Sequence, residues 1–302
     1  RRSLPGAHRP QKAGQVLVKS VRGALPALVV LLLAGCAWRR DTGFAWQRLT
    51  GAAAEGACSR DGAAAVCRWK PKGAAEDPDA VLFYLHYATG DERSAARVGV
   101  LQSFYRSYER AGRRPPRVFT ISYGGHWLLS DHPGRRQTVS RADFEALLRR
   151  LEKSPPKRRY LWGMSMGGYN AAEEALSSPR DWTAVVLQCP ALADVDPFAP
   201  PARGFTAVQK EGLALFNYRL GGPAVWAEEN PLVLARRPGP EPPFLIETNA
   251  ADEYGFQPGA RALAAELKSS GGSETLRVLP GGHCAVDGNA AAHFLLSSSP
   301  RD

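Results

Sequence analysis

The sequence has 302 residues, of which 44% are apolar and 23% are charged. This mixture is typical of a globular protein rather than a disordered one, and the length allows one large domain with a substantial core. Much of the net charge of +10 comes from residues 1–35, which hold six basic side chains and no acidic ones. The rest of the chain has 33 basic and 29 acidic residues and no basic patch with interleaved aromatics, so no nucleic-acid partner is expected.

The first apolar segment is residues 24–33 (ALPALVVLLL). Ten residues are too few to cross a bilayer as a helix, which needs roughly 20. Basic residues precede the segment and small residues follow it, which is typical of a secretory signal. Residues 33–36 (LAGC) resemble the lipobox of bacterial lipoproteins, which implies cleavage before Cys36 and acylation of that cysteine. A plain signal peptide, or a buried strand with an incidental cysteine, would explain the same segment.

Acyl chains on Cys36 would hold the protein at a membrane, because each buried methylene contributes roughly 0.8 kcal/mol and stable anchoring takes more than one chain. We therefore predict a lipoprotein signal peptide over 1–35 and a tether and N-terminal segment over 36–67, in an exported protein of the bacterial cell envelope. Ala37 stands where an Asp would indicate retention in the inner membrane. The resemblance to lipoproteins accordingly favours the outer membrane.

Cys58 and Cys67 bracket a hairpin-like loop with Asp61 and Gly62 at its turn. An exported protein meets an oxidising compartment, so a local disulfide between these two cysteines is predicted. A metal site is not expected, because no second pair of Cys or His has zinc spacing.

Beyond this loop, predicted strands alternate with predicted helices. Continuous apolar runs indicate buried strands, and apolar residues at helical spacing indicate helices. The strands are 81–86, 117–122, 160–162, 183–188, 243–247 and 275–279, and the helices are 92–111, one that begins at Ser140 with a capping box, 167–176, 258–269 and 288–296.

Such alternation predicts an α/β fold, with a mostly parallel, doubly wound sheet and helices on both faces. Residues 190–242 interrupt the pattern and are rich in Pro and Gly. They are predicted to form an insertion over the active site, inside a catalytic domain of residues 68–302.

Residues 163–168 read Gly-Met-Ser-Met-Gly-Gly, between a short apolar strand and an Ala-rich helix. A sharp strand-to-helix turn forces its central residue into a strained backbone conformation, and glycines on either side relieve the crowding. Ser165 would then project from the top of the sheet as a nucleophile, with the Met166 amide placed to donate to an oxyanion. A Gly-rich turn without chemistry is the alternative.

A serine hydroxyl needs a base, and six histidines are available. His283 lies in a loop at the C-terminal end of strand 275–279, at the edge where open α/β sheets bind ligands. The loop after strand 243–247 contains Asp252 and Glu253; Asp252 is preferred as the acid, because Glu253 would more naturally turn outward. A surface-loop role for His283 and a turn role for Asp252 are the alternatives. The order Ser165, Asp252, His283 is that of α/β-hydrolases.

Residues 68–296 resemble the esterase branch of the α/β-hydrolases that includes esterase D-like and feruloyl-esterase-like enzymes. The resemblance lies in residues 85–86 (LH) and 89–92 (TGDE), the strand-to-helix turn at 163–168, residues 249–252 and residues 279–283 (LPGGH). It implies hydrolysis of a small-molecule or polymer-borne ester through an acyl-enzyme, with no cofactor and no metal.

The chain departs from this family's pattern at Tyr87, where a Gly usually follows the histidine. The second oxyanion donor is therefore the N–H of either Tyr87 or Ala88. Two other functions remain open from the sequence: a non-catalytic envelope lipoprotein that keeps the fold, and a peptidase or acyltransferase with the same three residues.

Cys189 and Cys284 each follow a predicted strand at the C-terminal edge of the sheet. Their Cα atoms could come within the roughly 4.4–6.8 Å that a disulfide needs. A second disulfide is predicted here; the alternative is that Cys189 is a buried apolar residue and Cys284 merely flanks the site.

The lipobox resemblance makes a direct prediction about membrane attachment. Replacing Cys36 with Ser should release the protein into the soluble periplasmic fraction, because the acylated side chain is lost. Fractionation followed by a carbonate wash measures this. A Cys36→Ser protein that stays with the membranes after the wash would place the anchor elsewhere.

Overall fold

The computed structural model describes residues 54–132, 138–199, 205–210, 212, 222–237 and 239–298. The chain divides into two units at Trp46 and Gln47, and all of the described residues belong to the second. The predicted signal peptide, Cys36 and the part of the predicted tether and N-terminal segment up to residue 53 lie outside the described residues. None of the described helices is long and apolar enough to cross a membrane.

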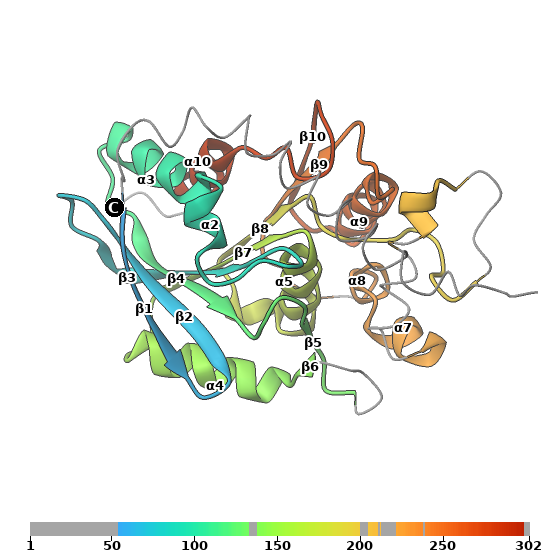
Figure 1. Cartoon of the computed structure of the whole chain (residues 1–302), viewed down its shortest axis with the longest axis horizontal. Coiled ribbons are helices and arrows are strands. Elements are labelled where there is room, and N and C mark those ends of the chain that lie inside the picture. Colours follow the sequence, from blue (N-terminus) through green and yellow to red (C-terminus); the bar gives the residue numbers. More distant parts are fainter. Residues whose placement is uncertain are drawn as a thin grey trace, which may run out of the picture. The chain divides into compact units, whose positions relative to one another are not determined.

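An eight-stranded sheet forms the centre of this unit, with the strand order β1-β2-β4-β3-β7-β8-β9-β10 (Figure 1). The pairs β1/β2 and β2/β4 are antiparallel, and the other five are parallel. The strands are β1 (Ala54–Asp61), β2 (Ala64–Pro71), β3 (Asp77–Leu85), β4 (Pro116–Ser122), β7 (Arg158–Met164), β8 (Ala184–Gln188), β9 (Phe244–Asn249) and β10 (Glu274–Leu279). The predicted α/β fold with a mostly parallel sheet is confirmed.

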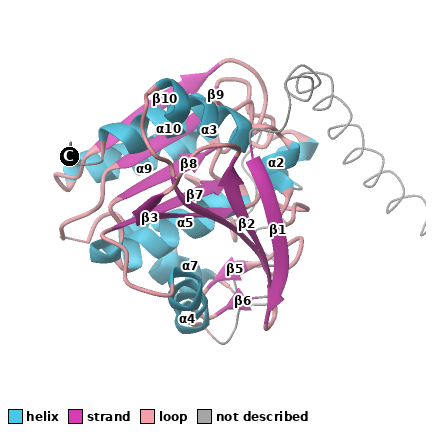
Figure 2. Cartoon of the chain, turned by 90° about the vertical axis from the view of Figure 1, so that its left-hand side faces the viewer, coloured by secondary structure: helices cyan, strands magenta, loops and turns pink. Residues whose placement is uncertain are grey.

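Helices cover both faces of the sheet (Figures 1 and 2). They are α2 (Ser94–Arg97), α3 (Val100–Arg110), α4 (Arg141–Glu152), α5 (Met166–Ser177), a 3₁₀ turn at Pro179–Asp181, α7 (Pro223–Glu229), α8 (Pro231–Leu234), α9 (Gln257–Ser269) and α10 (Gly288–Ser297). Helices α3 and α10 pack side by side on one face, and α4, α5 and α9 pack on the other.

The central strands supply a core on each face because successive side chains of a strand point to opposite sides. In β3, Val81, Phe83 and Leu85 pack under α4 and α5, whereas Leu82 and Tyr84 pack under α3 and α10. All five side chains are at most 1% exposed. Burial on both faces explains why β3 is a continuous apolar run in the sequence.

Two local signals in the sequence have different outcomes. The capping box is confirmed: Ser140 Oγ accepts a hydrogen bond from the Asp143 backbone N at 3.0 Å and so begins α4. The single helix predicted over 92–111 is wrong, because Gly99 adopts a φ of 80° and separates α2 from α3. A glycine takes this left-handed conformation at little cost, and it interrupts the helical hydrogen bonds.

The predicted domain boundary at residue 68 falls inside β2, so the sheet begins earlier than expected, at Ala54. The hairpin-like loop is real but longer, with two eight-residue strands that pair Cys58 opposite Cys67, and these cysteines form the predicted disulfide. Strand β1 reads AEGACSRD, and six of its eight residues are exposed. It has no apolar alternation, which is why its sequence does not indicate a strand.

Two further features lie in connections between the main strands. Strands β5 (Leu128–Leu129) and β6 (Thr138–Val139) form a small parallel ladder that the sequence did not predict. Helices α7 and α8 lie within the segment 190–242, between β8 and β9. That this segment covers the active site stays a prediction, since much of it lies outside the described residues.

Candidate active site

Ser165 occupies the turn between β7 and α5, with φ 54° and ψ −114°. Non-glycine residues rarely adopt such a conformation, and the surrounding structure must hold it. A Cβ atom at Gly163 would lie 2.0 Å from the Gly167 carbonyl oxygen, and one at Gly167 would lie 2.1 Å from the Leu85 carbonyl oxygen. Both positions therefore require glycine, because the backbone of β3 and α5 occupies the space of a side chain.

The segment after β8 holds the backbone of this elbow on both sides. The Ser165 N–H donates to the Gln188 carbonyl oxygen at 2.9 Å, and the Ala191 N–H donates to the Ser165 carbonyl oxygen at 3.0 Å. Pro190, between them, lies against Gly168, where a Cβ would come within 2.9 Å of its Cα. The strained serine is thus fixed by residues 188–191 as well as by its own helix.

The structure brings the three predicted residues Ser165, His283 and Asp252 into one hydrogen-bonded line. Ser165 Oγ lies 2.9 Å from His283 Nε2, and His283 Nδ1 lies 2.8 Å from Asp252 Oδ2. The side chains of His283 and Asp252 are only 4% and 1% exposed. Because a carboxylate accepts and does not donate, Nδ1 carries the proton and Nε2 is free to accept the serine proton.

Two residues without a predicted role hold the histidine loop. Glu253 is exposed, as expected, yet its Oε2 accepts a hydrogen bond from the His283 backbone N at 2.7 Å. Asn249, at the end of β9, is buried; its side chain accepts from the Cys284 N–H at 3.1 Å and donates to the Ala285 carbonyl at 2.8 Å. Sequence spacing carries no signal for either contact, since both connect loops that follow different strands.

Two aromatic rings from the loop after β9 pack against the imidazole of His283. The Tyr254 and Phe256 ring centroids lie 5.0 and 5.6 Å from that of His283, both edge-on. Phe256 is 7% exposed. The packing of these two rings and the hydrogen bond to Asp252 leave the imidazole little freedom to rotate away from Ser165.

The Met166 amide begins α5, directly after Ser165, where the first N–H groups of a helix have no intrahelical partner. Strand β3 ends against this elbow, because Leu85 and His86 carbonyl oxygens are the atoms nearest a Cβ at Gly167. The Thr89 N–H donates to Gly125 O at 2.6 Å and is occupied. This leaves Tyr87 and Ala88 as the predicted sources of the second oxyanion donor.

His86 fixes the peptide that joins Tyr87 to Ala88. The Tyr87 carbonyl oxygen lies 2.7 Å from His86 Nδ1 and accepts from the Gly90 N–H at 2.9 Å. Trp127 Nε1 donates to His86 Nε2 at 3.1 Å, so the proton of His86 is on Nδ1. Burial lowers the pKa of His86 and keeps it neutral. Since the C=O and N–H of a trans peptide point in opposite directions, the direction of the Ala88 N–H is set by these contacts.

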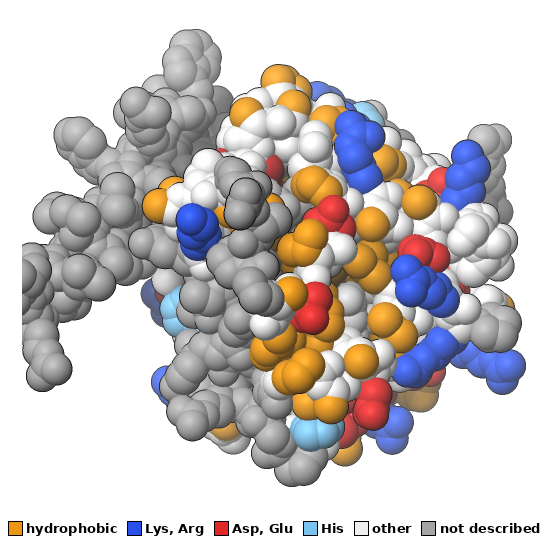
Figure 3. Space-filling model, turned by 90° about the vertical axis from the view of Figure 1, so that its right-hand side faces the viewer, with side chains coloured by type: hydrophobic (Ala, Val, Ile, Leu, Met, Phe, Trp, Pro, Cys, Tyr) orange, Lys and Arg blue, Asp and Glu red, His pale blue; other side chains and the backbone are white. Residues whose placement is uncertain are grey.

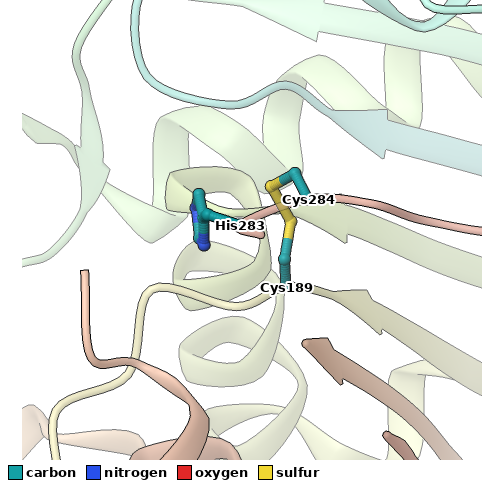
Figure 4. A group of neighbouring side chains, drawn as sticks. All are labelled: Cys189, His283 and Cys284. Atoms are coloured by element: carbon teal, nitrogen blue, oxygen red, sulfur yellow. A yellow bond between two sulfur atoms is a disulfide. The ribbon is translucent and has the colours of Figure 1, made fainter. Parts of the chain in front are cut away.

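Cys189 and Cys284 form the predicted disulfide beside His283, with their Cα atoms 5.1 Å apart (Figure 4). Among the described residues, Cys189, His283 and Cys284 are the one group whose potential ligand atoms, two sulfurs and a ring nitrogen, lie close enough together for a metal ion. Because both sulfurs are in the disulfide, they are not thiolates and do not offer a metal the ligands it needs.

Figure 3 shows the side of the molecule on which α7, α8 and α9 lie. Hydrophobic side chains reach the surface in the middle of this face, and Lys and Arg side chains gather toward one border.

The strand order, the strained serine between a strand and a helix, and its hydrogen-bonded His and Asp in that chain order are those of the α/β-hydrolase fold. Part of the chain also matches a known family of this fold. A family model described as serine aminopeptidase, S33, matches residues 108–236, which include Ser165 and end before Asp252 and His283.

Solved structures of esterases share the fold. Esterase B from Lactobacillus rhamnosis aligns with a TM-score of 0.61 at 18% identity, over 91% of this chain and 96% of that one. A ferulic acid esterase aligns with a TM-score of 0.59 at 15% identity, over 81% of this chain and 97% of that one. An S-formylglutathione hydrolase from Agrobacterium tumefaciens aligns with a TM-score of 0.58 at 16% identity, over 82% of this chain and 95% of that one. No curated protein matches the sequence.

The close approach at Gly163 can be tested by substitution. Gly163→Ala should lower the free energy of unfolding by about 2 kcal/mol or more, because the new methyl group meets the backbone oxygen of Gly167, which cannot move aside. Gly239→Ala is the matched control: no atom lies within 4 Å of its Cβ position, and its stability should change by less than about 0.5 kcal/mol. Urea denaturation measures both, and equal stabilities would contradict this account of the elbow.

Proposed function

We propose that this chain is a serine hydrolase that cleaves carboxylic esters through an acyl-enzyme. The observation that carries the proposal is the continuous Ser165–His283–Asp252 line, with bonds of 2.9 and 2.8 Å, at the C-terminal edge of the sheet. A nucleophile within hydrogen-bond reach of a base, itself oriented by a third group, is the arrangement that covalent catalysis needs.

In the first half of the reaction, Ser165 Oγ attacks the ester carbonyl carbon while His283 Nε2 takes the hydroxyl proton. The carbonyl oxygen becomes an oxyanion that accepts hydrogen bonds from the Met166 N–H and from the Ala88 or Tyr87 N–H. The tetrahedral intermediate then collapses, the bond to the alcohol oxygen breaks, and the imidazolium returns its proton to that oxygen. The acyl group remains on Ser165.

In the second half, water takes the place of the alcohol. His283 removes a proton from the water as its oxygen attacks the acyl carbon, and the Ser165–acyl bond breaks through a second oxyanion. The proton passes to Ser165 Oγ, and a carboxylic acid leaves. Asp252 holds the tautomer of His283 throughout and stabilises the imidazolium in each half-reaction.

Similar structures favour an ester substrate, since two of the three compared above are named as esterases and the third as an S-formylglutathione hydrolase. Peptide hydrolysis is a second candidate, because the matching family model is described as a serine aminopeptidase. The same three residues serve both reactions. Rates on an activated ester and on an aminoacyl anilide, measured with one preparation, separate the two candidates.

The proposed enzyme acts outside the cytoplasm, anchored by lipid at Cys36. The lipobox-like residues 33–36 support this location. Two disulfides in the described part of the chain also support it, because such bonds persist in exported proteins and are rare in the cytosol.

Ser165→Ala should abolish hydrolysis of a short activated ester and labelling by a fluorophosphonate probe, because both need the serine oxygen. Ser269→Ala, an exposed serine near the end of α9, is the control and should keep wild-type rate and labelling. Circular dichroism checks that both variants fold. A folded Ser165→Ala protein with an unchanged rate would refute the proposed function and favour a non-catalytic role.

The neighbouring carboxylates Asp252 and Glu253 offer a matched pair of variants. Asp252→Asn should lower kcat by roughly 10³–10⁴-fold, because an amide no longer fixes the tautomer or stabilises the imidazolium. Glu253→Gln retains an oxygen that can accept from the His283 backbone N–H, so its kcat should fall by less than about tenfold. Steady-state kinetics on the same ester compares them, and equal losses would contradict the separate roles.

A further inference from the structure

The base reaches the nucleophile from a distant strand. Ser165 follows β7 and His283 follows β10, and the order β7-β8-β9-β10 places β8 and β9 between them. The loop that carries His283 must therefore extend across the ends of two strands. The 2.9 Å separation of Ser165 Oγ and His283 Nε2 depends on what holds this loop in place.

On the nucleophile's side, Cys189 lies inside the segment that braces the elbow. Its neighbour Gln188 accepts from the Ser165 N–H, and Ala191, two residues on, donates to the Ser165 carbonyl. Cys189 itself donates from its N–H to the Glu247 carbonyl at 2.7 Å and is 1% exposed. Its Cα position is therefore fixed relative to Ser165.

On the base's side, Cys284 directly follows His283. Its sulfur is bonded to that of Cys189. The disulfide therefore joins the segment 188–191, which bonds to Ser165, to the residue that follows His283 (Figure 4). Both cysteines have a positive φ, 44° at Cys189 and 63° at Cys284. Non-glycine residues keep such conformations only where the surroundings impose them, so the turns at both ends of the bridge are held rather than relaxed.

The other contacts of this loop are non-covalent: hydrogen bonds, and the packing of Tyr254 and Phe256 against the His283 ring. Glu253, whose carboxylate accepts from the His283 N–H, is an exposed residue. Asn249 is buried, but it holds Cys284 and Ala285 from β9, not from the elbow. The disulfide is thus the one covalent link, among the described residues, between the loop of the base and the segment next to the nucleophile.

We propose that the Cys189–Cys284 disulfide positions His283 for catalysis, so that hydrolysis depends on the bridge being oxidised. The inference rests on the proposed function. A dithiol reductant would donate two electrons and two protons, the S–S bond would break to give two thiols, and the dithiol would become a disulfide. The His283 loop would then be held only by hydrogen bonds and side-chain packing. The base would spend less time within reach of Ser165 Oγ, which lowers the rate of the chemical step without removing any group that contacts the ester.

The test compares the two disulfides that the described residues form, each removed from the whole chain. Cys189→Ala/Cys284→Ala should lower kcat for an activated ester, and the rate of fluorophosphonate labelling, at least tenfold, with KM within about twofold. Cys58→Ala/Cys67→Ala, which removes the bridge between β1 and β2, should keep kcat within twofold even where thermal unfolding shows reduced stability. The split between kcat and KM distinguishes positioning from a general loss of folded protein.

Reduction provides a second measurement that does not depend on the folding of a double variant. Dithiothreitol added to the Cys58→Ala/Cys67→Ala protein should lower kcat while the circular dichroism spectrum is unchanged, and glutathione disulfide should restore it. Mass spectrometry of alkylated peptides confirms which cysteines are reduced.

Two results would overturn the inference: a bridge-less or reduced protein whose kcat stays within twofold, or a loss of kcat that follows the loss of the circular dichroism signal. The proposed function fails separately, if the oxidised wild type itself shows neither Ser165-dependent labelling nor Ser165-dependent hydrolysis.

Discussion

The backbone conformation of Ser165 is the constraint on which the rest of the site depends. A positive φ at a non-glycine residue persists only if its surroundings hold it, and here three elements do so. The carbonyl of Leu85 in β3 fills the space beside Gly167, α5 begins at the next residue, and residues 188–191 bond to the serine on both sides. Met166, whose N–H is the predicted oxyanion donor, is the first residue of that helix. The predicted nucleophile and the predicted oxyanion donor therefore both depend on one close approach between a helix and two strand ends.

Much of the fold could be predicted from the sequence because the central strands are buried on both faces. Runs such as residues 81–86 have no polar interruption, and their spacing with amphipathic helices indicates a parallel sheet. The candidate site could also be predicted in outline, since the carboxyl ends of parallel strands meet at one edge. Ser165, Asp252 and His283 each follow such a strand, and the same argument paired Cys189 with Cys284.

The rest could not be predicted because it depends on contacts between loops or on positions without apolar pattern. Strand β1 is mostly exposed and its residues show no alternation, so only pairing with β2 reveals it. Gly99 divides a helix whose apolar spacing continues across the break. Glu253 was expected to face solvent, and it remains exposed, yet its carboxylate reaches the backbone of His283. This contact depends on where the loop of His283 runs, and the residues next to Glu253 in the sequence do not determine that.

The two halves of the site differ in how they are held, and the sheet explains the difference. The elbow is assembled from β3, β7 and β8, which are adjacent in the sheet or joined by direct backbone bonds, so its parts need no further link. His283 arrives from β10 at the far edge, where the strand itself is only partly buried. The backbone hydrogen bonds between strands cannot fix a loop that leaves the sheet and extends across the ends of β9 and β8. Side-chain contacts from Asp252, Glu253 and Asn249, and the Cys284 sulfur, take over that function at the point where the regular structure ends.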